Sequence, residues 1–289
     1  MFGRCIAHHP TLFILALMLQ TSKYIDIREI IRQKNPGLLQ WLPFFVLSYI
    51  KRILHEDEIN AFMAEHGHET GLPFVHKIIE VFRVDVELRG AENIRSTGGV
   101  IYAANHPLGG LDAIAFMHKL GDYRTDMKFL VNDILTNIKN LEPLFVPVNK
   151  HGNQGRGAIQ ALDETLQSEE ALLVFPAGLV SRKQKHGIAD LEWKKTFISQ
   201  SRRYQKDVIP VYIEGRNSAF FYNLARLRKW LGVKANLEMF YLADEMFAQK
   251  GKKIVIHVGK PIPYSYFDKS KTDKDWATYV KSLVYKLAP

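Results

Sequence analysis

The 289-residue chain lacks the features that define several large classes of protein. Its single cysteine, Cys5, excludes an internal disulfide and a zinc site built from cysteines. The apolar run Leu12 to Leu19 has eight residues, whereas a helix that spans a membrane needs about 18 or more. The chain also has no internal repeat, no low-complexity tract and no long flexible linker. These absences favour one folded domain with extensions. The protein is expected in the cytosol or on the cytosolic side of a membrane.

The N-terminal apolar run has two interpretations of equal weight. A secretory signal is disfavoured, because the sequence Gln-Thr-Ser-Lys that follows the run offers no small-x-small cleavage site. The run is either part of an extension upstream of a natural start at Met18, or a helix that lies in a membrane interface.

The chain is rich in apolar residues, at 47%, and in basic ones, which give a formal net charge of +9 and a pI of about 9.4. The apolar fraction is enough for a full hydrophobic core. The positive charge indicates an anionic partner, which is a nucleic acid, a membrane surface or a phosphorylated substrate.

Short apolar strands alternate with segments of helical spacing from residue 72 onward, a pattern typical of an α/β sheet with helices on its faces. We expect a mainly parallel or mixed central sheet of about seven strands in a domain spanning residues 72–289, preceded by a helical, membrane-associating region at residues 1–71. The expected strands are 84–88, 100–104, 127–131, 144–148, 171–175, 208–213 and 253–258.

Residues 38–54 form the most apolar part of the N-terminal region, with twelve large apolar residues in seventeen. A helix is expected from Pro43, because proline suits the first turn of a helix. The helix is either packed in the core or lies in a membrane interface, with its aromatic side chains at headgroup depth. The charged segment that follows contains His66 and His68, but no third ligand at a recognisable spacing, so we expect a solvated surface and no metal.

The stretch from Val100 to Met117 is the centre of the predicted site. A buried-type strand ends at Ala104, and helical spacing resumes at Leu111, so the residues between them form a strand-to-helix turn. Open α/β sheets hold ligands at such turns. His106 lies there and can accept a proton near neutral pH, and a carboxylate on its other nitrogen, from Asp112, would fix the tautomer. The alternative is a turn histidine followed by an Asp that merely favours a helix N-terminus.

Three further stretches contain residues suited to binding. Phe145 to Ala158 is a strand, a glycine-rich turn and a helix start, where Lys150 and Arg156 can hold a phosphate or carboxylate; an ordinary loop is the alternative. Leu172 to Arg182 is a buried strand that ends in a Pro/Gly turn. The segment 181–206 has eight basic residues, either solvated or bound to an anionic membrane or acidic carrier protein; its aromatic side chains lack any nucleic-acid-binding signature.

Asn-His-Pro-Leu-Gly-Gly-Leu-Asp, residues 105–112, resembles the first motif of the glycerolipid acyltransferase superfamily, which includes the lysophosphatidic acid acyltransferases. The usual motif has four residues between its His and its Asp, whereas His106 and Asp112 have five between them. This spacing, with the Pro and the paired Gly, is similar to the hemolysin-like branch, which acylates ornithine lipids and other amino-acid lipids.

Other segments resemble the family's later motifs. Val148 to Lys150 occupies the place of the second motif, with Lys150 where an Arg usually contacts the acceptor phosphate, and Val208 to Asn217 is similar to the fourth. Phe-Pro-Ala-Gly-Leu-Val-Ser-Arg resembles the third motif, with Ala177 in place of the usual Glu, a form that fits the amino-acid-lipid branch. The substrate-binding residues that the resemblance implies are Asn105, Lys150, Arg156, Phe175, Pro176, Ala177, Gly178, Ser181 and Arg182.

The resemblance implies an O-acyltransferase on the cytoplasmic face of a membrane, which moves a fatty acyl group from a thioester to the hydroxyl of a lyso-lipid. His106 would act as general base and Asp112 would orient it, with no metal or prosthetic group. The donor is an acyl carrier protein or coenzyme A thioester, and the acceptor a lyso-amino-acid lipid or, alternatively, lysophosphatidic acid. The competing class is a noncatalytic basic protein that binds membrane or nucleic acid.

Overall fold

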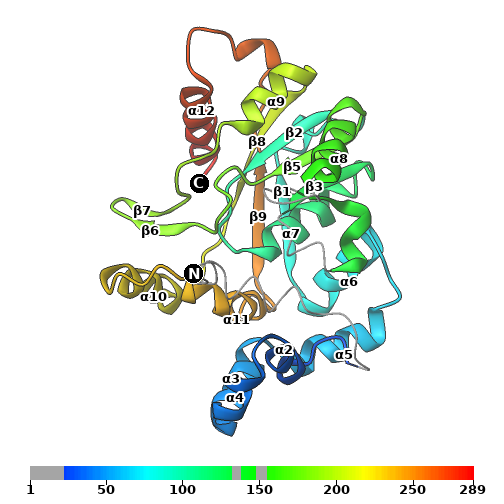
Figure 1. Ribbon diagram of the computed structural model, residues 1–289. Coiled ribbons are helices and arrows are strands. Elements are labelled where there is room, and N and C mark those ends of the chain that lie inside the picture. The colour runs from blue at the N-terminus through cyan, green and yellow to red at the C-terminus, as the bar shows by residue number, and fades with distance from the viewer. Residues whose placement is uncertain (1–22, 132–137, 148–154) are drawn as a thin grey trace.

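The computed structural model describes residues 23–131, 138–147 and 155–289. The N-terminal apolar run and Lys150 therefore lie outside the described residues. Within them, a twisted sheet has helices packed on both faces (Figure 1).

The central sheet has seven strands in the order β1-β9-β8-β2-β5-β3-β4. The five strands from β8 to β4 are mutually parallel, β9 runs antiparallel to β8, and β1 is parallel to β9. This confirms the expected fold of a mainly parallel, mixed sheet flanked by helices. The bounds are β1 Asp85–Arg89, β2 Val100–Ala104, β3 Met127–Val131, β4 Phe145–Pro147, β5 Ala171–Val174, β8 Asp207–Ile213 and β9 Lys253–Val258.

The sequence pattern did not predict a two-stranded hairpin, β6 Arg182–Gln184 and β7 Gly187–Ala189. Its strands have only three residues each, which is too short for an apolar alternation from which a strand could be predicted. In Figure 1 the hairpin extends to one side of the sheet, above α10.

In the described residues, side chains cap the first N–H groups of α2, α3, α10 and α12. Ser218, for example, accepts from Phe221 N at the start of α10, and Thr272 accepts from Asp275 N at the start of α12. The helices are α2 Ile27–Lys34, α3 Pro36–Trp41, α4 Phe44–Ile53, α5 Glu56–His66, α6 Leu72–Phe82, α7 Gly110–Leu120, α8 Gly155–Gln167, α9 Thr196–Tyr204, α10 Ala219–Trp230, α11 Leu242–Phe247 and α12 Asp273–Lys286, with short 3₁₀ turns that include η3 Lys139–Leu144 and η4 Leu237–Tyr241.

The central strand β2 is buried on both sides, and its alternate residues face two different cores. Tyr102 packs in the cluster that contains α6 and α7, whereas Ile101 packs in the cluster that contains α9 and α12. Burial on both faces explains why β2 reads as a continuous apolar run.

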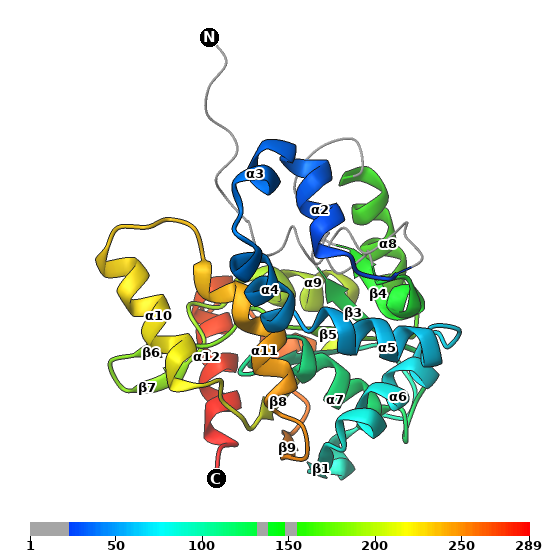
Figure 2. The same cartoon turned by 90° about the horizontal axis from the view of Figure 1, so that it is seen from below.

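The N-terminal helices α2 to α4 share a small hydrophobic cluster of their own, which includes Ile27 and Leu47. The helix expected from Pro43 is confirmed, with Pro43 as the residue just before α4. Its sides differ: Ile53 is buried in the cluster, while Phe44 and Phe45 point to solvent. Figure 2 shows α4 crossing near α11. None of the helices in the described ranges is both long and apolar enough to cross a bilayer.

The basic run at residues 181–206 does not form one surface. Arg182 and Lys206 are buried, and Arg202 pairs with Asp273. Trp193 and Phe197 pack in the core and are therefore not exposed to a partner. Both residues are apolar because their side chains belong to the core cluster that also contains the buried residues of α12.

Candidate active site

The loop after β2 begins with Asn105, whose side chain ties it to the neighbouring strand. The amide Nδ2 donates to the carbonyl oxygen of Ile213 at 2.9 Å, and the amide oxygen accepts from the Ile213 N–H at 2.6 Å. Asn105 is only 3% exposed, so both bonds are shielded from water. Both polar groups of its side chain are thus engaged with β8, and a contact with substrate stays a prediction.

His106 and Asp112 lie together despite the additional residue between them. His106 Nδ1 is 2.8 Å from an Asp112 oxygen, and the carboxylate also accepts from the backbone N–H groups of Leu108 and Gly109 at 3.0 to 3.1 Å. The loop closes tightly because Gly109 adopts φ +88°, and a side chain there would press on Leu242. The predicted contact between these two residues is therefore present, with Asp112 in the first turn of α7.

Complete burial raises the pKa of the Asp112 carboxyl, and the hydrogen bonds from His106, Leu108 and Gly109 oppose that rise. A carboxylate held by so many donors keeps the His106 proton on Nδ1 when the ring is neutral. Nε2 is then the basic nitrogen. The ring is partly exposed, so a substrate can reach it.

Phe175 supports the His106 ring from the side of β5. The two rings stack with centroids 4.2 Å apart and planes within 16°. Phe129 contacts the Phe175 ring edge-on. Phe175 is followed by the turn Pro176-Ala177-Gly178, in which Gly178 N donates to the Phe175 carbonyl oxygen. The third-motif turn thus lies beside the general-base candidate, as expected for a shared site.

Asp190 joins this turn to the loop of His106, a role that the sequence pattern did not reveal. Its carboxylate accepts from the His106 N–H at 3.2 Å, from the Ser181 hydroxyl at 2.6 Å and from Trp193 Nε1 at 2.8 Å. The Ser181 N–H donates in turn to the His106 carbonyl oxygen. Asp190 is fully buried. It therefore sets the position of the His106 backbone, and the predicted contact of Ser181 with substrate remains untested.

Arg182, another predicted binding residue, is buried in a charge network away from this ring. It pairs with Glu238 at 3.0 Å, and Arg228 binds the same carboxylate at 2.9 Å. Its guanidinium also lies 5.1 Å from the centre of the Phe221 ring. Burial lowers the pKa of Arg182, while Glu238 opposes the shift. The structure gives Arg182 a part in joining β6 to α10 and η4.

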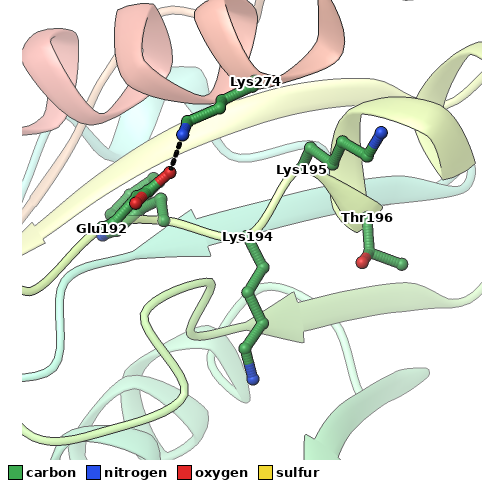
Figure 3. Close-up of a pocket in the computed structure, with 6 residues that line it drawn as sticks. Glu192, Lys194, Lys195, Thr196 and Lys274 are labelled. Carbon is green, nitrogen blue, oxygen red and sulfur yellow. Dashed lines mark ion pairs between the residues drawn. The ribbon is translucent and has the colours of Figure 1, made fainter.

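Lys194 brings a positive charge to the third-motif turn. Its backbone N–H donates to the Pro176 carbonyl oxygen, and its ammonium lies so close to Gly178 that a Cβ there would be 2.8 Å from Nζ. Figure 3 shows its side chain pointing away from the Glu192–Lys274 ion pair. Sequence reasoning placed Lys194 only in the basic run, because the contact with Gly178 depends on the path of the chain after the hairpin.

The second-motif residues cannot be placed in this arrangement. Lys150 lies outside the described residues, and the side chain of Arg156 is not described either. The backbone of Arg156 lies in the first turn of α8, where the sequence predicted the start of a helix. No cluster of three or more His, Cys, Asp or Glu residues suited to a metal occurs in the described part of the chain. What remains is an imidazole and a carboxylate in contact, an arrangement that can perform general-base chemistry.

Comparison with known proteins identifies relatives of this chain. A family model described as "Acyltransferase" matches residues 29–288. The chain is 47% identical over 264 residues to a lyso-glycine lipid O-acyltransferase of Bacteroides thetaiotaomicron, covering 91% of this chain and 97% of the relative. It is 44% identical to the protein of the same name from Phocaeicola vulgatus, covering 91% and 95%. The structure of the 1-acyl-sn-glycerophosphate acyltransferase PlsC from Thermotoga maritima aligns at 18% identity and TM-score 0.45, covering 88% of this chain and 97% of that one.

Proposed function

Because this chain belongs to the acyltransferase family, we propose that it transfers a fatty acyl group from a thioester to the hydroxyl of a lyso-glycine lipid. The observation that carries the proposal is the His106–Asp112 contact within a chain that matches two lyso-glycine lipid O-acyltransferases over nearly their whole length.

The reaction needs one base and no external redox partner. His106 Nε2 removes the proton from the acceptor hydroxyl as that oxygen attacks the thioester carbonyl carbon, and Asp112 stabilises the imidazolium that forms. The C–S bond then breaks, and the departing thiolate takes the proton from His106. The new ester and the free thiol leave the site, and the imidazole is neutral again.

The third-motif turn supports a carboxylate-bearing acceptor. A lipid that carries glycine through its nitrogen keeps a free carboxylate, which a Glu in the turn would repel and a cation would attract. Ala177 stands where the superfamily's motif usually has Glu, and Lys194 Nζ lies over Gly178. We assign the carboxylate of the acceptor to this end of the site.

The experiment is a purified-enzyme assay that offers lyso-glycine lipid and lysophosphatidic acid side by side, with acyl carrier protein and coenzyme A thioesters as donors. We expect acylation of lyso-glycine lipid to exceed that of lysophosphatidic acid, and Lys194→Gln to raise the KM for lyso-glycine lipid. Lys274→Gln, which changes a cation of the neighbouring Glu192 pair, is the matched control. Preferential acylation of lysophosphatidic acid would refute the proposed acceptor.

We also propose that the enzyme reaches its lipid through an aromatic surface on α3 and α4. Trp41, Phe44 and Phe45 are 86%, 85% and 72% exposed. The surface continues through Tyr49, whose hydroxyl bonds that of Tyr241 at 2.8 Å. The Tyr241 ring in turn contacts Phe220 at the start of α10. Each large side chain removed from water contributes roughly 1.5 to 3 kcal/mol, which supports binding to a bilayer interface.

Vesicle binding tests this attachment. Replacing Trp41, Phe44 and Phe45 with Ser should release the protein from anionic vesicles in a flotation assay, while circular dichroism stays unchanged because all three side chains are exposed. A Lys185→Gln, Lys195→Gln variant, which alters only exposed charges, should release less protein. If the triple-Ser protein still floats with the vesicles, another surface is the anchor.

A further inference from the structure

A pocket of about 810 Å³ opens at the same edge of the sheet as His106 but on the side of β8. Three segments form it: the β6–β7 hairpin, the loop that enters α10, and the end of α11 with the residue before β9. The hairpin and α10 lie side by side in Figure 1. Its polar lining includes Lys183, Arg216, Asn217, Glu245 and Lys252.

Asn217 is the unusual member of this lining. It is 4% exposed, and among the described residues neither the oxygen nor the nitrogen of its side-chain amide has a hydrogen-bond partner. A buried polar group without a partner costs about 1 to 3 kcal/mol, so native proteins rarely keep one without a use. An amide that lines a pocket in this state is suited to bind a polar ligand.

The charges around Asn217 favour an anion. Arg216, Lys183 and Lys252 each bring a cation, and within the described ranges none of the three forms an ion pair. The single acid, Glu245, is already engaged, because its carboxylate accepts from the N–H and the hydroxyl of Ser218. The N-terminus of the twelve-residue α10 adds its dipole to the same place.

The pocket is next to the catalytic loop. Gly215, two residues before Asn217, lies against Leu108, so closely that a Cβ at Gly215 would be 2.8 Å from the Leu108 side chain. On the other wall, Tyr222 packs with Val180 and Leu242, and both of these side chains lie against Gly109. A ligand with its anionic end at Asn217 therefore has a short path over this wall to His106.

We propose that this pocket binds the phosphate end of the phosphopantetheine arm of the acyl-thioester donor, an inference that rests on the proposed function. The proposed function assigns the single carboxylate of the acceptor to the turn at Gly178, beside Lys194, on the β5 side of His106. The donor arm ends in a phosphate, in coenzyme A and in an acyl carrier protein alike, and three cations match that charge better. The donor then approaches His106 from the side of β8, and the acceptor approaches it from the side of β5.

Binding and kinetics of the full-length protein test the proposal. Charge-assisted bonds to phosphate suggest that Arg216→Gln and Asn217→Asp each weaken binding of coenzyme A and 4′-phosphopantetheine about tenfold by calorimetry. The donor KM should rise by a similar factor while the acceptor KM stays within about twofold. Lys253→Gln is the matched control, because it changes the next cation along the chain, which pairs with Glu87 outside the pocket; it should leave both constants unchanged.

The outcomes are separable. Equal losses with coenzyme A and carrier-protein thioesters support the proposal, because both donors share the arm phosphate. A loss confined to coenzyme A overturns it, because the bound groups would then be the nucleotide phosphates that the carrier protein lacks. A rise in the acceptor KM alone, or normal donor binding by both variants, overturns the proposal. Because calorimetry uses no acceptor, a wild-type protein that binds the arm but does not acylate lyso-glycine lipid refutes the proposed function and leaves this site standing.

Discussion

Two buried asparagines follow neighbouring parallel strands, yet they differ in what their amides do. Asn105, after β2, is 3% exposed and bonds both polar groups of Ile213. Asn217, after β8, is 4% exposed, and its amide has no partner in the described structure. Burial alone therefore does not tell a structural residue from a binding residue. The first asparagine holds the His106 loop in place, whereas the proposed role of the second is to bind a ligand, at some cost in stability.

The largest effect should come from the base on the loop that Asn105 holds. His106→Ala removes the proton acceptor, and general-base catalysis contributes about 10²- to 10⁴-fold, so kcat should fall by that factor. The measurement is acyl transfer by the purified variant, with circular dichroism as the control for folding. Turnover near the wild-type rate in a folded variant would contradict the assigned role.

The next effect is on stability. Asn105→Leu leaves the N–H and the carbonyl of Ile213 buried without partners, so the free energy of unfolding should fall by about 2 to 4 kcal/mol. Urea unfolding measures the change. A loss under about 0.5 kcal/mol would mean that water replaces the amide, and that the loop does not depend on it.

Asp190 should matter for the rate more than for binding. Asp190→Asn puts a donor where the carboxylate accepts from His106 N, Ser181 and Trp193, so the His106 ring should shift. A misplacement of this kind lowers kcat about tenfold to a hundredfold, with the KM of both substrates nearly constant. Ser181→Ala, which removes one donor to the same carboxylate, is the milder control. Equal losses in kcat and in affinity would point to a general structural defect.

Asn217→Leu should not destabilise the fold, in contrast to Asn105→Leu. Removing an amide that has no partner should leave the free energy of unfolding unchanged or raise it by about 1 kcal/mol, while donor binding weakens. Urea unfolding of the two Leu variants under one set of conditions makes the comparison direct. A loss above 1 kcal/mol in both would erase the distinction between the two asparagines.

The smallest effect concerns pH and lies at the far end of α7. Burial, and then the neighbouring His76, lower the pKa of His118, whose Nδ1 is 2.7 Å from that of His76. The unfolded chain therefore binds a proton at His118 more readily than the folded chain does, and stability falls as the pH drops below about 6.5. His118→Gln should flatten the decline in melting temperature between about pH 7 and pH 5. An unchanged slope would assign that decline to other groups.

Local sequence determined much of the sheet and the centre of the site. All seven expected strands are present, and no bound differs by more than one residue, because buried strands read as apolar runs whatever their neighbours are. His106 and Asp112 could be paired from the sequence because both lie in one strand-to-helix turn. The exposed aromatic face of α4 could not be separated from a core helix, since both interpretations use the same residues.

The tertiary structure alone decided which groups meet from distant parts of the chain. Asp190 lies 84 positions from His106, and the two meet only because the hairpin returns the chain to β2. Arg182, which the sequence predicted to bind substrate, instead forms a buried ion pair with Glu238, and Arg228 binds the same carboxylate. In the sequence, Asn105 and Asn217 are alike, because each is an asparagine that follows a buried strand. Their opposite roles arise from hydrogen-bond geometry, which depends on the order of strands in the sheet and not on local composition.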